Sequence, residues 1–453
     1  MLVFAGCKAV GPDYEVPQLD LPAGFSQSGV KWTRVGAGKE IKNRSWWRVY
    51  GDGTLNAIMD RSLANNQELA GASARLKQAR ALSASVRSLY FPSIDLGAGA
   101  ERSRFRFRGP SGGSNIQESY EIPVTLRYEF DVWGKVRRQV ESAEAGEAAT
   151  KESLNALRLA VAGEVAQTYW ALRAVDADRE ILSRAVELRQ RAFGILKKQQ
   201  EGGAISGLDL SRAETELASA DAERIRLDQD RVELVNALAV LSGSVAIGSK
   251  VNSSGVMPEA PGVPVSVPSD VLRQRPDIRA AERRVAAANA EIGVATAAFY
   301  PSVSIDASGG FDSTTLGDLF TADSLVWSLG PNVSIPLTGQ KFLRQRRDAA
   351  LAAHEVATAE YRQTVLDAMR EAENAIQAVS ILKRREAAQR NATESARKTF
   401  DLSTKRYEGG LVNFLDVVDA ERSRLDSERL LNAVKAEQLA ISVALFRAMG
   451  GAW

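Results

Sequence analysis

Apolar and polar residues alternate strictly over one stretch of this chain of 453 residues. From Tyr120 to Asp131 every even position is apolar, and every odd position is Glu, Pro, Thr, Arg or Asp. Side chains of a β-strand point to opposite faces in turn, so this alternation indicates a strand with one apolar face and one polar face. We therefore expect a strand over about 118–131.

Three further stretches carry the same alternation more weakly. They predict strands over about 93–107, 302–312 and 326–337. Past Glu101 the apolar phase of the first of these slips by one residue, which predicts a bulge or the end of the strand there. The glycine-rich and serine-rich segment Gly109–Asn115 is expected to be a loop.

Elsewhere the hydrophobic period changes from 2 to 3.6. Apolar residues at spacings of 3, 4 and 7, with no proline between them, predict two long helices over 135–200 and 341–407. Each is roughly 100 Å long at 1.5 Å per residue. Shorter helices are expected over 54–89, 210–241, 276–299 and 415–449.

One short sequence motif occurs twice in the chain. The ten residues Glu201–Leu210 return as Glu408–Val417, and in both copies a pair of glycines follows a long helical pattern. Glycine adopts the positive φ that ends many helices, so each copy is expected to be the tip of a helical hairpin, at 200–209 and 407–416. The chain is therefore interpreted as two halves of one design.

The residues after each glycine pair predict the start of a new helix. Ser206 and Asn413 occupy the position of an N-cap, and Asp209 and Asp416 follow three residues later. A carboxylate at that position faces the free N–H groups of the first turn.

The repeat suggests how the chain is divided. The expected segments are a signal remnant at 1–7, an extended arm at 8–53, a first repeat at 54–243, a proline-rich equatorial linker at 244–270 and a second repeat at 271–453 that ends in an equatorial C-terminus.

Strand counting predicts an oligomer. Long alternating strands with aromatic ends are typical of lipid-spanning β-barrels, although a half-exposed hairpin in water shows the same alternation. Four strands cannot close, and an open edge in lipid leaves backbone N–H and C=O groups without partners. Two chains would give eight strands and a filled barrel, whereas three would give twelve and a lumen.

Composition excludes several classes of function. With 58 Lys and Arg against 56 Asp and Glu, the net charge of +2 gives no reason to expect nucleic acid as a partner. One Cys rules out an internal disulfide framework. A single His and five Met leave no metal-ligand cluster, so we expect no cofactor and no metal. The chain has no apolar run of about 18 residues and therefore no expected transmembrane helix.

The single cysteine lies close to the start of the sequence. Small residues precede Cys7, as in the lipobox of bacterial lipoproteins, in which the cysteine carries lipid, although Phe4 stands where leucine is usual. The alternative is a cysteine that occurs there by chance. Lys8 at the next position would by analogy direct such a lipoprotein to the outer membrane. The six residues before Cys7 are too few for a complete signal peptide and include no positive charge, so they are interpreted as its remnant.

Five motifs, taken in order, resemble one family. They are Cys7–Pro17, Ser45–Asp52, Leu272–Glu282, Ala298–Ser302 and Leu415–Arg422. Together they resemble the lipoprotein branch of the TolC-like outer membrane efflux proteins, which serve tripartite RND pumps.

The resemblance implies an α+β membrane protein of a Gram-negative bacterium. It would be a homotrimer with a 12-stranded β-barrel in the outer membrane lipid, four strands from each chain, and a long α-helical coiled-coil-like tunnel in the periplasm. Its implied function is a passive exit duct for small molecules such as drugs. The implied partners are a periplasmic adaptor (membrane fusion) protein and an inner-membrane RND transporter.

The resemblance also implies roles for the hairpin tips. Docking of the adaptor is expected at Gly202, Gly203, Ser206, Gly409, Gly410 and Asn413. The closed pore gate is expected at Leu415, Asp416 and Asp419. Asp416 has an equally good alternative role as a helix cap, whereas Asp419 lies one turn further in and has less use as a cap.

A lock between neighbouring hairpins is expected beside this gate. The resemblance points to Tyr407 and Asp209 as candidates for its bonds. Val412 stands where some relatives carry an Arg that joins the lock. Arg406 or Arg422 is expected to replace that missing cation.

Two other classes of protein were weighed. Asp416 and Asp419 are adjacent carboxylates on one helix face, without a partner base or an evident cleft, so the chain is not expected to be an enzyme. A trimeric coiled-coil stalk or adhesin would use the same helices without a lumen and stays the alternative. Conductance in planar bilayers separates the two, because a stalk conducts no ions.

Overall fold

The structure is a computed structural model that describes residues 8–20, 32–33, 45–106, 113–246, 251, 257–262, 265–266 and 274–451. The chain forms two compact units, which are described separately. The first comprises Met1–Gln18, Arg75–Lys151 and Ala280–Arg362, and the second comprises Leu19–Ala74, Glu152–Arg279 and Gln363–Trp453. Cys7 lies outside the described residues.

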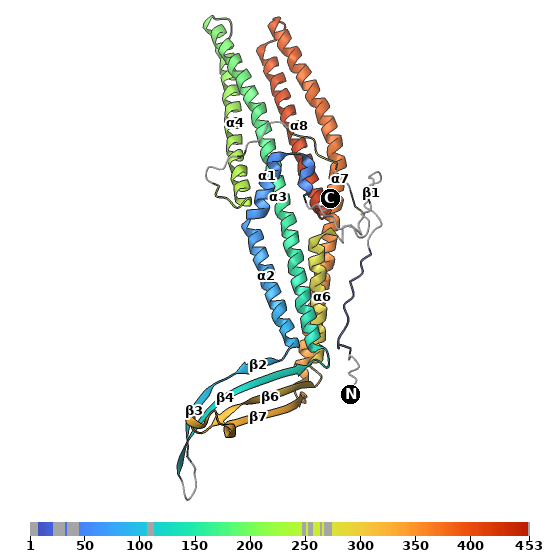
Figure 1. Cartoon of the computed structure of the whole chain (residues 1–453). Helices are drawn as coiled ribbons and strands as arrows, with labels where there is room; N and C mark the ends of the chain where they lie inside the picture. The colour runs from blue at the N-terminus through green and yellow to red at the C-terminus, as the bar shows by residue number, and fades with distance from the viewer. Residues whose placement is uncertain are drawn as a thin grey trace. The chain divides into compact units, whose positions relative to one another are not determined.

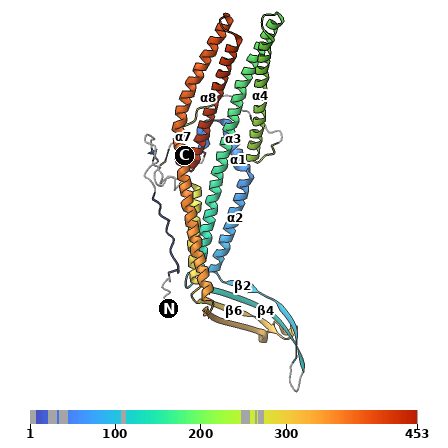
Figure 2. The same cartoon turned by 180° about the vertical axis from the view of Figure 1, so that it is seen from behind.

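The first unit is built on an antiparallel sheet (Figures 1 and 2). Its strands are β2 (Ser93–Leu96), β3 (Gly99–Arg106), β4 (Ser114–Phe130), β6 (Ser302–Ser313) and β7 (Leu325–Ser334). The order across the sheet is β2, β4, β6, β7, and β3 continues alongside β4 beyond β2. Both edges of this sheet, β7 on one side and β2 with β3 on the other, lack a partner strand among the described residues.

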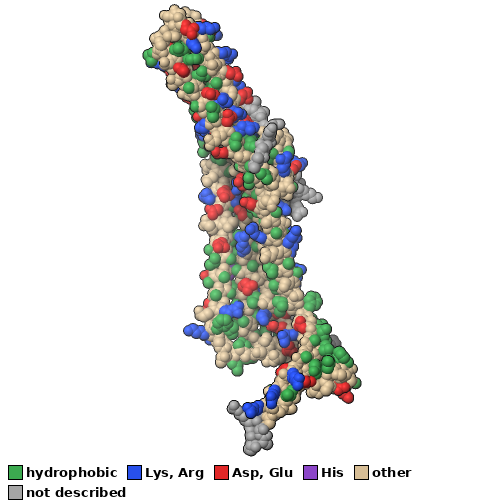
Figure 3. All heavy atoms as spheres, turned by 90° about the vertical axis from the view of Figure 1, so that its left-hand side faces the viewer, with side chains coloured by type: hydrophobic (Ala, Val, Ile, Leu, Met, Phe, Trp, Pro, Cys, Tyr) green, Lys and Arg blue, Asp and Glu red, His purple; other side chains and the backbone are tan. Residues whose placement is uncertain are grey.

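One face of the sheet is apolar on β2, β4, β6 and β7. In one cross-strand row Ile94 lies opposite Leu126, Leu126 opposite Ala307, and Ala307 opposite Leu329. The apolar side chains at the edges are largely exposed, with Leu329 at 63%. Figure 3 shows hydrophobic side chains gathered over the sheet. The opposite face is polar and contains the ion pair of Arg127 and Asp306 at 3.0 Å.

The first edge of the sheet corrects the sequence prediction. β2 and β3 pair with β4 in one register, which runs from Ser93 opposite Arg127 to Arg106 opposite Ser114. The ladder has a short break at residues 97–98. The bulge or strand end expected past Glu101 was therefore wrong. The apolar phase slips because Phe105 lies on the polar face, not because the backbone changes register. The last two residues of the loop expected at 109–115 belong to β4, which begins at Ser114, and residues 109–112 lie outside the described residues.

Helices adjoin one end of the sheet. The short 3₁₀ helix η2 (Ser88–Tyr90) links α2 (Gln67–Arg87) to β2, and β4 leads into α3 (Lys135–Glu201). In the second half α6 (Pro276–Ala297) precedes β6, and β7 leads into α7 (Gln340–Glu408). The opposite end of the sheet has the β3–β4 connection and the β6–β7 connection, which contains η3 (Leu316–Asp318) and η4 (Ala322–Ser324).

The N-terminal arm is fixed to the first unit by specific contacts. Val10 N donates to Trp133 O at 3.0 Å, and the buried guanidinium of Arg138 binds Asp13 at 2.7 Å. Gly11 has a φ of 90°, and a Cβ atom added there would lie 2.5 Å from the Cα atom of Gly293. Only glycine fits this close approach.

The second unit is helical. It contains α1 (Gly53–Asn65), α4 (Gly207–Leu241), α8 (Phe414–Ala448), most of α3 and α7, and the short parallel pair β1 (Trp32–Thr33) and β5 (Val265–Ser266). The single helix expected over 54–89 is two helices, because Asn66 ends α1 in an extended conformation. Its side chain then accepts a bond from Leu69 N at the start of α2.

The core of the second unit contains an aromatic cluster. It is formed around η1 (Trp46–Tyr50), so the last part of the arm expected to be extended is a 3₁₀ helix. Trp46 is 2% exposed and stacks on Phe446 of α8 with ring centroids 5.2 Å apart. Tyr50 packs on Trp170 of α3 at 5.1 Å. These contacts tie the N-terminal segment to α3 and α8.

Candidate functional site

The two hairpin tips share one backbone geometry. After α3, Gly203 has a φ of 75°, and Ala204 N donates to Gln199 O at 2.8 Å. After α7, Gly410 has a φ of 70°, and Leu411 N donates to Arg406 O at 2.9 Å. This bonding satisfies the last carbonyl groups of each helix. The predicted helix ends at the glycine pairs are confirmed, with the second glycine of each pair supplying the positive φ.

The predicted N-caps are also confirmed. The Asn413 side chain accepts a bond from Asp416 N at 3.0 Å, and the Asp416 carboxylate accepts one from Asn413 N at 3.2 Å. This reciprocal capping box uses the Asp416 side chain in starting α8. In the other hairpin Asp209 N donates to Ser206 Oγ at 3.3 Å, and Ser206 Oγ donates to the Asp209 carboxylate at 2.8 Å.

The other expected gate residues lie on the first two turns of α8. Leu415 is 42% exposed, and the Asp419 side chain is 65% exposed. Among the described residues Asp419 forms an ion pair with Arg422, with Nη1 3.9 Å from Oδ1, and this pair is weak. Asp419 is therefore free of a capping role and available to face another chain or a solvent-filled space.

The expected lock residues separate into two groups. Arg422 of α8 binds Glu216 of α4, so it bridges the two hairpins of one chain. Tyr407 packs its ring edge against Phe414 across its own tip, with centroids 5.7 Å apart. Arg406 is exposed in the last turn of α7. Asp209 is bonded locally to its cap, and the structure does not bring it together with Tyr407 in any described bond.

A second bridge between the hairpins was missed by the sequence analysis. Arg189 of α3 donates from Nη2 to Glu421 Oε2 of α8 at 2.7 Å and from Nη1 to Glu216 O of α4 at 2.8 Å. The side chains of Arg189 and Glu421 are 11% and 6% exposed. A signal for it exists in the sequence: Arg189 interrupts the heptad row of the buried residues Leu182 and Leu196.

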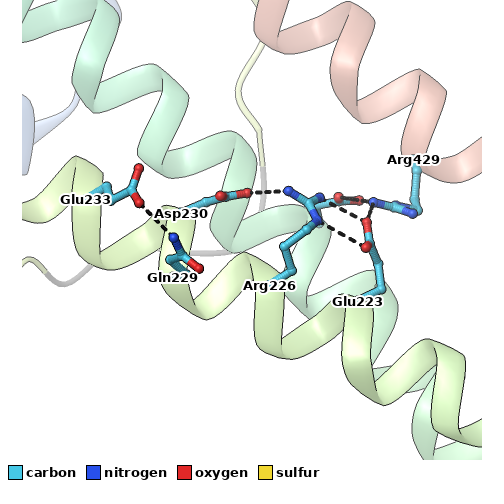
Figure 4. Close-up of polar contacts among 7 residues, drawn as sticks. Glu223, Arg226, Gln229, Asp230, Glu233 and Arg429 are labelled. Atoms are coloured by element: carbon cyan, nitrogen blue, oxygen red, sulfur yellow. Dashed lines mark hydrogen bonds and ion pairs between the residues drawn. The ribbon is translucent and has the colours of Figure 1, made fainter.

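A third bridge lies further from the tips (Figure 4). Arg429 of α8 binds Asp178 of α3 at 3.0 Å and Glu223 of α4 at 2.9 Å. Arg226, one turn along α4, also binds Glu223 at 2.9 Å. Hydrogen bonds from Arg226 and Arg429 hold the pKa of Glu223 at about 2, below its usual value of 4.5. This carboxylate is therefore ionised throughout the neutral range.

These contacts define what the site does within one chain. Arginines at three levels connect α8 of the second hairpin to α3 and α4 of the first, while both tips are exposed. Such charged links hold two hairpins in one relative position and break when the hairpins separate.

Among the described residues no group of three or more His, Cys, Asp or Glu is arranged to hold a metal ion. In the same ranges no helix is long and apolar enough to cross a membrane.

Comparison with known proteins gives one consistent result. The model of the outer membrane efflux protein family matches residues 58–244 and 267–451. The chain is 31% identical to the solvent efflux pump outer membrane protein SrpC of Pseudomonas putida, with all of this chain and 97% of SrpC aligned. It is 32% identical to the outer membrane protein OprJ of Pseudomonas aeruginosa, over 99% of this chain and 94% of OprJ.

Solved structures give the same result for the fold. The outer-membrane channel OprN superposes with a TM-score of 0.90 at 30% identity, over 98% of this chain and 99% of OprN. The open state of the MtrE outer membrane channel of Neisseria gonorrhoeae superposes with a TM-score of 0.84 at 25% identity, over 98% of each chain.

Proposed function

This chain belongs to the outer membrane efflux protein family, and we propose that three copies of it form one exit duct that passively carries small molecules such as drugs out of the cell. Relatives named as outer membrane components of solvent and toluene efflux pumps support the export of small apolar molecules. The partners we propose are a periplasmic adaptor protein, which docks at the hairpin tips, and an inner-membrane RND transporter.

The sheet is the observation that carries this proposal. It has one face that is apolar on β2, β4, β6 and β7, and two edges that lack a partner strand among the described residues. In lipid an unpaired edge leaves N–H and C=O groups unsatisfied, so β7 of one copy must pair with β2 and β3 of the next. β2 and β3 pair with β4 in one register and count as one edge strand, so each chain supplies four strands. Three copies then contribute twelve strands, which is wide enough for a lumen lined by the polar face.

The order of elements supports the proposed two-repeat division. Each half runs through helix (α1 and α2 in the first half, α6 in the second), antiparallel strands, a helix of 67 or 69 residues, a glycine tip and a helix of 35 residues. The proposed segments are therefore a first repeat at 54–243 and a second at 271–453, joined by an equatorial linker at 244–270. In the arm before them, Cys7 is the proposed site of lipid attachment.

The gate we propose consists of Leu415 and Asp419 on the first turns of α8. Their exposure supports a position at the axis of the trimer. Asp416 contributes less, because its carboxylate is engaged in the capping box. Arg422 takes the place of the arginine absent at Val412, since it already bridges α8 and α4. Tyr407, Asp209 and Arg406 stay proposed contacts to neighbouring copies.

Two measurements test the shared barrel. Native mass spectrometry of the detergent-solubilised protein should give three chains per particle, and planar bilayers containing it should conduct ions. A stable monomer or dimer would contradict the shared barrel. A trimer without conductance would support the stalk or adhesin instead.

Lipid attachment has its own test. Cys7→Ala should lose incorporation of labelled fatty acid yet stay in the membrane fraction, because an acyl anchor adds affinity without replacing a spanning structure. Complete solubility of this variant would show that the strands do not span lipid.

A further inference from the structure

A row of arginines continues the apolar face of β4 beyond its apolar residues. On this face β4 is apolar at every second position from Phe130 to Tyr120. Beyond Tyr120 the register places Arg102 opposite Glu118, Arg104 opposite Ile116 and Arg106 opposite Ser114. Opposed residues of an antiparallel pair share a face, so the three arginines project from the apolar side of the sheet.

The arginine row, defined as Arg102, Arg104 and Arg106, lies at the end of the sheet away from the helices. Helices adjoin the end formed by Ser93 and Phe130, whereas Arg106 and Ser114 flank the opposite connection. In Figure 3 Lys and Arg side chains are visible on this end of the sheet. If the helices are periplasmic, as in the proposed function on which this inference rests, the arginine row is on the outer side of the membrane.

The apolar run below the row has the length of a bilayer core. Ten residue steps separate Phe130 from Tyr120, which is roughly 33 Å along a strand and roughly 25 Å of membrane thickness at a tilt of about 40°. The arginines pair with positions two, four and six residues beyond Tyr120. Arg102 therefore stands roughly 5 Å above the apolar band, within the headgroup layer, and Arg104 and Arg106 stand roughly 10 and 15 Å above it, on the outer side of that layer.

Interfacial depth makes these charges tolerable. An arginine on the lipid face costs about 2–4 kcal/mol at the bilayer midplane and about 0–1 kcal/mol near the interface. Tyr120, whose ring marks the top of the apolar run, is the residue type found in interfacial belts. The row is thus placed where an arginine meets phosphate, not hydrocarbon.

The guanidinium groups are only partly occupied within the chain. Arg102 forms an ion pair with Glu118 at 3.3 Å, and its side chain is 70% exposed. Arg104 donates to Ser114 Oγ at 2.9 Å, and both Arg104 and Arg106 are exposed. Three cations face one carboxylate, and an exposed ion pair of this kind exchanges readily for a doubly charged anion. Arginine's planar fork matches phosphate in two-point hydrogen bonding.

We propose that the arginine row binds the phosphate groups of an anionic lipid in the outer leaflet of the outer membrane. The row forms a vertical track on the outer surface of the barrel, and a phosphorylated glycolipid seated on it buries its acyl chains against the apolar rows below. Three copies of the chain present three such tracks.

The test is lipid titration of the assembled protein in detergent, followed by native mass spectrometry. The probes are bis-phosphorylated lipid A, the same lipid with both phosphates removed, and inorganic phosphate. Each arginine near a charged lipid surface contributes a factor of roughly five, so the wild type should prefer the phosphorylated lipid by at least about tenfold. The variant R102Q/R104Q/R106Q should lose that preference, and R102K/R104K/R106K should keep most of it.

Arg127→Gln is the matched control, because Arg127 lies in the same sheet on the polar face. It should leave the lipid preference unchanged. Equal binding of phosphorylated and stripped lipid by the wild type, or an unchanged preference in the glutamine variant, would overturn the proposal. Full competition by millimolar inorganic phosphate would instead indicate a free-anion site. If R102Q/R104Q/R106Q loses trimers but keeps the lipid preference, the arginine row forms contacts between copies and does not bind lipid.

The proposed function is judged separately on the same preparation. A wild type that forms conducting trimers but shows no phosphate preference refutes only the lipid site. A wild type that neither assembles nor conducts refutes the duct itself. If R102Q/R104Q/R106Q fails to assemble, R102K/R104K/R106K serves as the second variant, because it keeps the three positive charges.

Discussion

Replacing Arg189 by methionine should loosen the connection between the two hairpins. Arg189 holds Glu421 through Nε at 3.1 Å and Nη2 at 2.7 Å, both to Oε2. The other carboxylate oxygen, Oε1, is buried and has no hydrogen-bond partner among the described residues. The charge of Glu421 therefore depends on this one guanidinium.

The size of the effect follows from burial. Removing one partner of a buried ion pair typically costs about 3–5 kcal/mol, because the other charge stays buried without compensation. Glu216 also loses its contacts with Arg189 but keeps Arg422 as a partner, so the charge left without compensation is that of Glu421. At about 1.4 kcal/mol per factor of ten, opening of the hairpin contact should become roughly 140-fold to 3,700-fold more frequent.

Hydrogen–deuterium exchange measures this opening directly. Backbone amides of α8 around Glu421 should exchange faster in Arg189→Met, and bilayers containing the variant should leak more ions. Arg184→Gln is the matched control, since Arg184 forms an exposed i,i+4 pair with Glu180 that contributes only about 0.3–0.5 kcal/mol. The double variant R189M/E421M should recover most of the protection, because no buried charge is left.

Two results would refute this reasoning. One is equal exchange in Arg189→Met and Arg184→Gln, which would mean that the bridge contributes nothing to holding the hairpins. The other is a double variant as unprotected as the single variant, which would mean that Arg189 acts through packing and not through the charge of Glu421.

Four further outcomes are expected. Asp419→Ala should lower the cation selectivity of conductance, because carboxylates gathered at a narrow axis attract cations. Asp416→Ala should chiefly destabilise the start of α8, by about 1 kcal/mol. Unchanged cation selectivity in the variant D416A/D419A would mean that the gate lies elsewhere. The lowered pKa of Glu223 means that its contribution to stability is complete above about pH 4.5 and is lost as the pH falls towards 2. Thermal unfolding of Glu223→Gln should then differ from that of the parent at pH 7 but not at pH 2, and parallel pH profiles would contradict this. Gly11→Ala should release the N-terminal arm, since its Cβ would clash with Gly293, and limited proteolysis that cleaves the arm no faster than in the parent would exclude this role.

The sequence by itself determined the features that depend on neighbouring residues. Gly203 and Gly410 end helices, and Ser206 and Asn413 start them, through bonds that span three to five residues. These bonds form wherever the local sequence permits, so the tips were predictable to the residue. The faces of the strands followed from alternation for the same reason.

Register and packing decided the rest. From the sequence alone, the slip in the apolar phase near Phe105 is equally consistent with a bulge. Only the pairing of β3 with β4 shows that the register is unbroken and that Arg102 lies on the apolar side. A strand's own sequence does not fix which partner residue lies opposite.

The bridges between the hairpins also required the tertiary structure. Arg189 and Glu421 are 232 positions apart, and Arg422 and Glu216 are 206 apart. Each residue alone has the pattern of a charge on a helix surface. Which charges become buried together depends on how the second hairpin packs against the first, and that is set by the sum of contacts along both hairpins, not by any local pattern.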